Sequence, residues 1–135
     1  MKKAFVSLFI LLLFMSCKVT NIDIPETIEY PSWFVKGTYV DDDNINRFTF
    51  QKDYVSWCVN TLNFCITVDV KDIEILHSVP GDYTGFTIRY IDDTGIVSFH
   101  IYKEEKRYDT VEINSVVTTY NGSVVKKNFG WCDLL

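Results

Sequence analysis

The chain has 135 residues, enough for one domain with a sizeable core and too few for two domains of ordinary size. It carries 18 acidic residues against 13 lysines and arginines, a formal net charge of −5, and lacks the basic clusters of a nucleic-acid-binding protein. Aromatic residues make up 16% of the chain and β-branched residues recur throughout, a mixture that favours strands over helices.

Residues 1–16 have the pattern of a secretory signal peptide. Lys2 and Lys3 form a basic start, and residues 4–15 are apolar apart from Ser7. About a dozen apolar residues are too few for a membrane-spanning helix, which needs roughly 20, but they suit the core of a signal peptide. The pattern ends at Phe14-Met15-Ser16-Cys17, which resembles the lipobox of bacterial lipoproteins. The resemblance implies that Cys17 becomes the new N-terminus and carries acyl chains such as palmitate.

The same resemblance implies a cellular location. Residue 18 is a lysine, where lipoproteins retained in the inner membrane often have an aspartate, so we expect a lipid anchor in the outer membrane, facing the periplasm or the cell surface. Phe14 and Met15 are bulkier than the residues usual in a lipobox. Ordinary secretion with cleavage nearby is therefore the alternative.

Polar residues and prolines interrupt residues 17–32, which predicts a lipidated tether, and the domain is expected to span 33–135. It opens with a predicted strand over residues 33–40 that contains Gly37, a residue type that marks bulges and close backbone approaches in strands. Asp41-Asp42-Asp43-Asn44 predicts the turn that follows.

Three segments of period two come next, and two of them set their own register. Phe48 and Phe50 lie in a half-buried strand, and residues 54–59 and 63–70 then alternate apolar and polar side chains around a loop over 60–63. The predicted facing pairs are Val59 with Phe64, Trp57 with Ile66, Val55 with Val68, and Ser56 with Thr67. On the polar side Cys58 faces Cys65, which predicts a disulfide in an oxidising compartment. Cys132 is then odd, and is either free or takes one of these partners itself.

The second half of the chain continues the pattern. Ile73 and Ile75 indicate a short strand, and a clear hairpin pairs Phe86, Ile88 and Tyr90 with Ile101, Phe99 and Val97 around the turn at residues 92–95. Residues 103–107 form a charged loop, after which Val111 and Ile113 indicate another strand. Asn121-Gly122 predicts a final hairpin with a type I′ turn.

These segments predict an all-β domain, a single antiparallel up-and-down barrel of about eight strands, because a meander of this length must close or cover its edges. Trp33-Phe34-x-x-Gly37-Thr38-Tyr39, followed by the acidic turn and Phe48-Thr49-Phe50, resembles small bacterial lipoproteins with a lipocalin-like barrel. Tyr39 stands where lipocalins have a tryptophan. The resemblance implies a small apolar ligand.

One face of each strand supplies the expected interior. The residues expected to line a ligand site or fill the core are Phe48, Phe50, Trp57, Phe64, Phe86, Tyr90, Phe99 and Ile101, within a wider inward set that adds Val55, Ile66, Val68, Ile88, Val97, Val111 and Ile113. An eight-stranded barrel is only just wide enough for its side chains or one small ligand. The bulk of the rings favours a mostly filled core, although aromatic residues also line real pockets.

The chemistry of the sequence does not indicate an enzyme. His77 and His100 have no nucleophile or acid linked to them by spacing, residues 41–43 lack the spacing of a calcium loop, and no cluster of Cys and His suggests zinc. No cofactor is expected. Two functions remain, a barrel that binds a small apolar ligand or an interaction protein, such as an inhibitor or adhesin, that uses the loops of a solid barrel and has an unknown protein partner.

Overall fold

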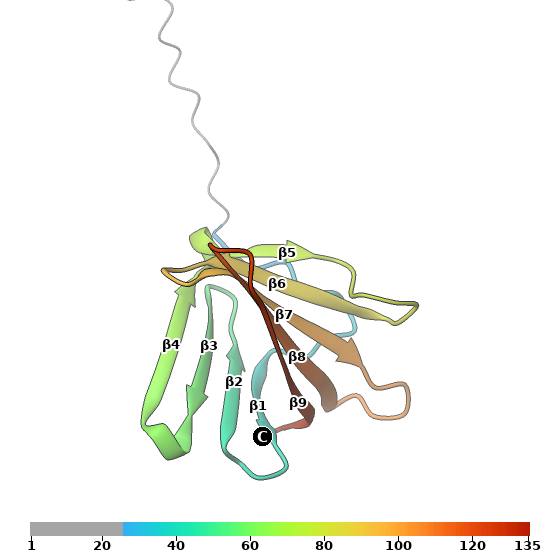
Figure 1. Ribbon diagram of the computed structural model, residues 1–135. Coiled ribbons are helices and arrows are strands. Elements are labelled where there is room, and N and C mark those ends of the chain that lie inside the picture. The colour runs from blue at the N-terminus through green and yellow to red at the C-terminus, as the bar shows by residue number, and fades with distance from the viewer. Residues whose placement is uncertain (1–25) are drawn as a thin grey trace, which may run out of the picture.

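Figure 1 shows the computed structural model, which describes residues 26–135; the predicted signal peptide and Cys17 lie outside the described residues. Nine antiparallel strands form one sheet in the order β4-β3-β2-β1-β9-β8-β7-β6-β5. The strands are β1 (Gly37–Asp41), β2 (Asn46–Phe50), β3 (Tyr54–Val59), β4 (Phe64–Asp69), β5 (Glu74–Leu76), β6 (Gly85–Ile91), β7 (Gly95–Lys103), β8 (Thr110–Thr119) and β9 (Val124–Leu134). Two single 3-10 turns, η1 (Asn60–Leu62) and η2 (Val70–Asp72), flank β4.

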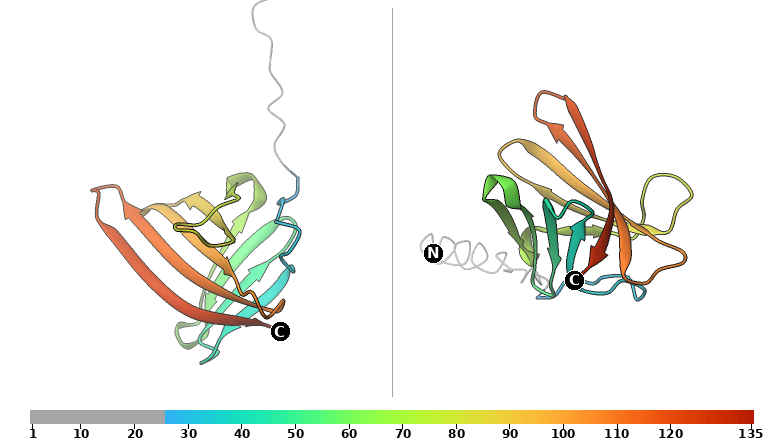
Figure 2. Two further views of the ribbon diagram at one scale, coloured as in Figure 1. Left: turned by 90° about the vertical axis from the view of Figure 1, so that its right-hand side faces the viewer. Right: turned by 90° about the horizontal axis from the view of Figure 1, so that it is seen from below.

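The sheet consists of two meanders joined through the first and last strands. β1 to β4 form one meander and β5 to β9 the other, and β1 pairs with β9 through Tyr39 opposite Leu134 and Asp41 opposite Cys132. The sheet curls so that its two halves face each other as a half-barrel (Figure 2). The predicted all-β antiparallel fold is therefore confirmed.

The predicted closed barrel of about eight strands does not form. The sheet has nine strands, and its two terminal strands, β4 and β5, do not pair with each other. Asp69 accepts a hydrogen bond from the Lys71 amide, and the Ile73 amide donates to Val70, so the chain turns through η2 as it leaves β4. β5 has only three residues and pairs only with β6. The local turn at η2 thus takes the chain out of the β4 ladder before a closing strand can pair with it.

The registers of the two central hairpins are confirmed. β3 and β4 pair Val59 with Phe64, Trp57 with Ile66, Val55 with Val68 and Ser56 with Thr67, and β6 and β7 pair Phe86 with Ile101, Ile88 with Phe99 and Tyr90 with Val97. The loop over residues 60–63 is the expected wide one, in the form of η1. Cys58 and Cys65 are opposite each other and form the predicted disulfide, whereas Cys132 is free and buried.

The last hairpin lies at Asn121-Gly122 as predicted, but the prediction of a type I′ turn there was wrong. Only Gly122 has a positive φ, of 86°, and the ladder closes through the Thr119 amide, which donates to Ser123 over 2.9 Å. The loop therefore has one residue more than a two-residue turn, with glycine in the left-handed position. The Asn121 side chain accepts from the Ser123 amide over 3.1 Å, which stabilises this longer loop.

The segment before β1 belongs to the domain rather than to the tether. The Ile28 amide donates to Lys52 over 2.6 Å, the Tyr30 hydroxyl donates to Gln51 over 2.8 Å, and Ile28 is buried. The expected tether thus ends before residue 28, and the expected strand over 33–40 begins only at Gly37. The Phe34 ring is buried against the half-barrel.

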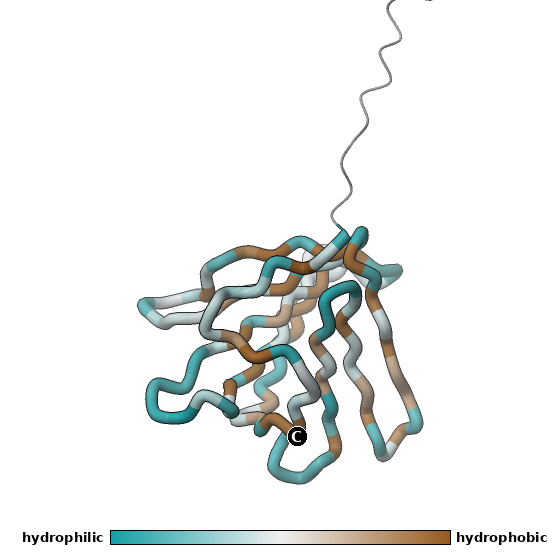
Figure 3. The backbone as a smooth tube through the Cα atoms, turned by 180° about the vertical axis from the view of Figure 1, so that it is seen from behind, coloured by the Kyte–Doolittle hydropathy of each residue, from teal (hydrophilic) through white to brown (hydrophobic). Residues whose placement is uncertain are grey.

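Most of the expected interior is buried, and brown apolar positions alternate with white or teal ones along the strands in Figure 3. The buried members of the core set are Phe48, Phe50, Phe86, Tyr90, Phe99 and Ile101, and Val55, Ile88, Val97, Val111 and Ile113 join them. Trp57, Ile66 and Val68 are half-buried. Phe64 is 46% exposed and is not a core residue, because β4 is the edge of the open sheet.

Candidate functional site

The interior of the half-barrel is filled with aromatic rings. Phe129 lies 5.0 Å from Phe48 and 5.6 Å from Trp57, and Phe48 lies 5.8 Å from Phe99, measured between ring centroids. The cavity between β2, β3, β4, β6 and β7 that these rings leave has a volume of about 10 Å³. That is the space of about one water molecule and leaves no room for an organic ligand.

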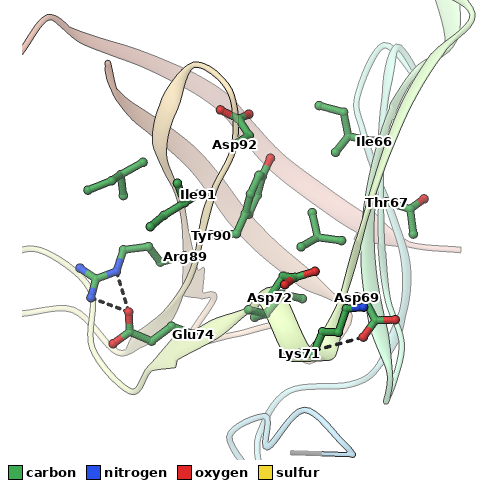
Figure 4. A pocket seen from close by; sticks show the side chains of 13 residues that line it. Ile66, Thr67, Asp69, Lys71, Asp72, Glu74, Arg89, Tyr90, Ile91 and Asp92 are labelled. Carbon is green, nitrogen blue, oxygen red and sulfur yellow. Dashed lines mark hydrogen bonds and ion pairs between the residues drawn. The ribbon is translucent and has the colours of Figure 1, made fainter. Parts of the chain in front are cut away.

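A much larger space opens on the side of the molecule, where the sheet fails to close. This lateral cleft has a volume of about 930 Å³ and lies between β4 and η2 on one wall and β5, β6 and the start of β7 on the other (Figure 4). Small-molecule sites typically measure about 300–1,000 Å³, so the cleft is large enough for a ligand. Its lining residues are Ile66, Thr67, Val68, Asp69, Lys71, Asp72, Ile73, Glu74, Arg89, Tyr90, Ile91, Asp92 and Ile96.

The floor and lips of the lateral cleft are apolar. Ile66 and Val68 point inward from β4, and Val68 and Ile73 pack against the core. On the opposite wall Ile91 is 69% exposed and Ile96, its partner across the β6–β7 ladder, is 41% exposed. The two residues alternate with the inward-facing Tyr90 and Val97, so they face outward and form an exposed apolar pair at the lip of the cleft.

Tyr90 is the polar group at the bottom of the lateral cleft. Its side chain extends into the space between the two walls (Figure 4), and the residue is only 8% exposed. Its hydroxyl makes no hydrogen bond with residues 26–135 and is not one of the fully buried polar atoms without a partner, so the oxygen is accessible from the open space of the cleft. Burial, helped by Asp92, raises the pKa of Tyr90 to about 12, so the hydroxyl stays protonated and can donate to a ligand.

Acidic side chains dominate the rim. Four acidic residues line the cleft against two basic ones, and one of the basic residues, Arg89, is paired with Glu74 through a hydrogen bond of 2.8 Å. Asp69 and Asp92 accept backbone hydrogen bonds from Lys71 and Thr94 and keep lone pairs free. The rim therefore favours a positively charged group on the ligand.

Tyr90, which was expected to line a ligand site or fill the core, is buried and lines the lateral cleft. Ile66 and Val68, from the wider inward set, line it too. Phe48, Phe50, Phe86, Phe99 and Ile101 lie in the core, Trp57 donates to Asn46 over 3.1 Å, and Phe64 lies on the edge strand. Cys17 lies outside the described residues.

The sequence did not reveal the acidic rim, because its members meet only where β4 and β6 face each other. The only feature of the sequence that pointed to an open sheet was the short segment with Ile73 and Ile75, because so short a strand can hardly close a barrel. Of the two histidines, His100 is half-buried and donates through Nδ1 to Thr87, whose hydroxyl donates to Ser78. Burial lowers the pKa of His100.

Comparison with protein-family models, curated proteins and solved structures found no match. The lipoprotein and lipocalin-like resemblances therefore remain predictions from the sequence. Residues 26–135 contain no helix long and apolar enough to cross a membrane, and no group of three potential metal-ligating residues is found in that part of the chain.

Proposed function

We propose that this protein is an exported, membrane-anchored binding protein that takes an apolar, positively charged partner in the lateral cleft. One contrast supports this proposal over a carrier that encloses its ligand. The cavity among the core rings has about 10 Å³, whereas the lateral cleft offers about 930 Å³ with an apolar floor, an acidic rim and the unpartnered Tyr90 hydroxyl. The protein is thus an interaction protein with a solid core, whose contact site is the open seam of the sheet.

The anchor in this proposal rests on the sequence that ends at Cys17. Several acyl chains hold a protein firmly in a bilayer, at about 0.8 kcal/mol per buried CH₂ group. The bacterial outer membrane is the proposed location. A small apolar ligand, as the lipocalin-like resemblance implies, would have to occupy the lateral cleft.

The test uses a dansylated alkylamine, which carries an apolar tail, a positive charge and a fluorophore. The protein is the chain from Lys18 to Leu135, which contains every strand and the disulfide. We expect saturable binding to one site. Ile91→Lys places a positive charge on the lip of the cleft and should weaken binding at least tenfold. Val125→Lys is the matched control, because Val125 is 58% exposed and does not line the cleft.

The opposite pattern would remove the proposal. Binding that survives Ile91→Lys but is lost when Phe99→Lys is made in a protein that still folds would place the ligand in the core. An anionic fatty acid that binds more tightly than the alkylamine would contradict the role of the acidic rim.

A further inference from the structure

We propose that the natural occupant of the lateral cleft is an extended, basic segment of another protein that adds as a further strand to the free edge of β4. This inference rests on the proposed function and specifies the class of partner. It follows from the backbone of β4, from the side chains around it, and from their charge.

The backbone of β4 has unused hydrogen-bonding groups. The Val70 amide donates to Asp53 over 2.8 Å, so these two residues form a hydrogen-bonded pair of the antiparallel ladder. Such pairs alternate with pairs whose N–H and C=O groups point away from the neighbouring strand. Counting back along β4, the groups of Asp69, Thr67 and Cys65 point away from β3. The Cα atoms of Cys58 and Cys65 are 4.0 Å apart, which agrees with a non-hydrogen-bonded pair.

Nothing among residues 26–135 pairs with that edge, because β4 is the terminal strand of the sheet. The facing wall also has unused groups. The Asp92 amide donates to Gly95 over 3.0 Å, so by the same alternation the N–H and C=O of Ile91 point away from β7. β5 ends its pairing with β6 at Glu74 opposite Arg89 and does not reach Ile91. Free main-chain groups therefore border the lateral cleft on both sides.

The edge lacks the features that protect strand edges from pairing. Native edges are blunted by lysines, prolines, bulges or a covering segment. β4 contains one charged residue, Asp69, and no proline, and its register with β3 has no irregularity. The Cys58–Cys65 disulfide also holds β4 to β3, which keeps the edge in place for a partner. An added strand gains affinity from main-chain hydrogen bonds and specificity from alternate side chains.

Charge determines the kind of strand. Side chains of the partner that face the cleft floor meet Ile66, Val68 and Tyr90, so they should be apolar. The residues between them approach a rim with Asp69 and Asp92, so they should be basic. A second copy of this chain fits less well, because it is acidic overall and its own β4 would bring Asp69 to the same rim.

The probe is a synthetic peptide with blocked ends in which valine alternates with lysine and threonine. Two control peptides have the same sequence with N-methyl groups on every second amide. In one control the methylated amides are those that would pair with β4, and in the other they are the amides that point away from it. We expect the plain peptide to bind the chain from Lys18 to Leu135 and to slow hydrogen exchange at the Cys65, Thr67 and Asp69 amides. N-methylation on the pairing set should abolish this protection, and N-methylation of the other set should leave it.

The matched variants change one backbone donor. Thr67→Pro removes an N–H that points away from β3, which an edge strand tolerates, and should weaken the peptide at least tenfold. Thr67→Val keeps the N–H and should bind within about twofold of the wild type. Nuclear Overhauser effects between β3 and β4 and an intact disulfide in Thr67→Pro would show that the fold survives.

The outcomes separate this inference from the proposed function. If Ile91→Lys weakens both the alkylamine and the peptide but Thr67→Pro changes neither, the cleft binds ligands and strand pairing is wrong. If the peptide does not bind at millimolar concentration, the inference is overturned whatever the alkylamine does. If the chain itself dimerises and Thr67→Pro makes it monomeric, the occupant is a second copy and the inference is overturned.

Discussion

Phe34 offers the sharpest test of how this half-barrel is held together, because the sequence places it at the start of a strand and the structure places it in the core. The residue is 8% exposed, and its ring lies 4.8 Å from Phe86, 5.1 Å from Phe50 and 5.5 Å from Tyr39, measured between centroids. Phe50 ends β2 and Phe86 lies near the start of β6. The ring therefore packs between two strands that are far apart in the sheet.

Replacing Phe34 with alanine should lower the free energy of unfolding by about 3–5 kcal/mol, the usual cost of replacing a buried phenylalanine with alanine. A domain of this size is stable by only about 5–15 kcal/mol, so the variant should be marginal. The expected fall in melting temperature is on the order of 10–20 °C. Phe34→Leu, which keeps most of the apolar volume, should cost about 1–2 kcal/mol and remain folded.

The assay is urea unfolding of the chain from Lys18 to Leu135, followed by tryptophan fluorescence. Val35→Ala is the matched control, because Val35 is the next residue and is 44% exposed. It should change the free energy of unfolding by less than about 0.5 kcal/mol. If Phe34→Ala costs no more than Val35→Ala, the segment before β1 behaves as a tether and the packing of Phe34 does not stabilise the domain.

Three further predictions concern the cysteines. Replacing both Cys58 and Cys65 with serine should lower the free energy of unfolding by about 2.4 kcal/mol, the loop-closure entropy for a separation of 7 residues, and an unchanged urea midpoint would contradict this. Burial, with Asp41 nearby, raises the pKa of Cys132 from 9.0 to about 12, so its contribution to stability should be complete below pH 9 and lost as the pH rises toward 12. A Cys132→Ala variant should flatten that alkaline fall in urea titrations, and a thiol that reacts with a disulfide reagent in the native protein would argue against its burial. Cys17→Ser should move the protein from the membrane pellet to the soluble fraction, and a variant that stays in the pellet would show that the anchor is not an acyl chain on Cys17.

The sequence by itself determined the local pairings. The registers of β3 with β4 and of β6 with β7 follow from apolar residues at every second position, because a slip of one residue would turn every apolar side chain outward. The Cys58–Cys65 disulfide follows from that register, since the two cysteines become cross-strand neighbours. Asn121-Gly122 located the last hairpin but not the shape of its turn, because the choice between two and three loop residues depends on where the ladder of β8 and β9 ends.

Only the tertiary structure decided which distant strands meet. The pairing of β1 with β9 buries Cys132, and the packing of Phe34 extends the domain back to Ile28, yet neither leaves a periodic signal in the sequence. Local alternation likewise cannot say whether β4 will find a partner on its second side. Phe64 reads as an inward residue in its own hairpin and is exposed because the chain turns away at η2 and leaves the seam open. The lateral cleft exists for the same reason. Its two walls are the opposite ends of one sheet, and only the curvature of the whole sheet brings them to face each other.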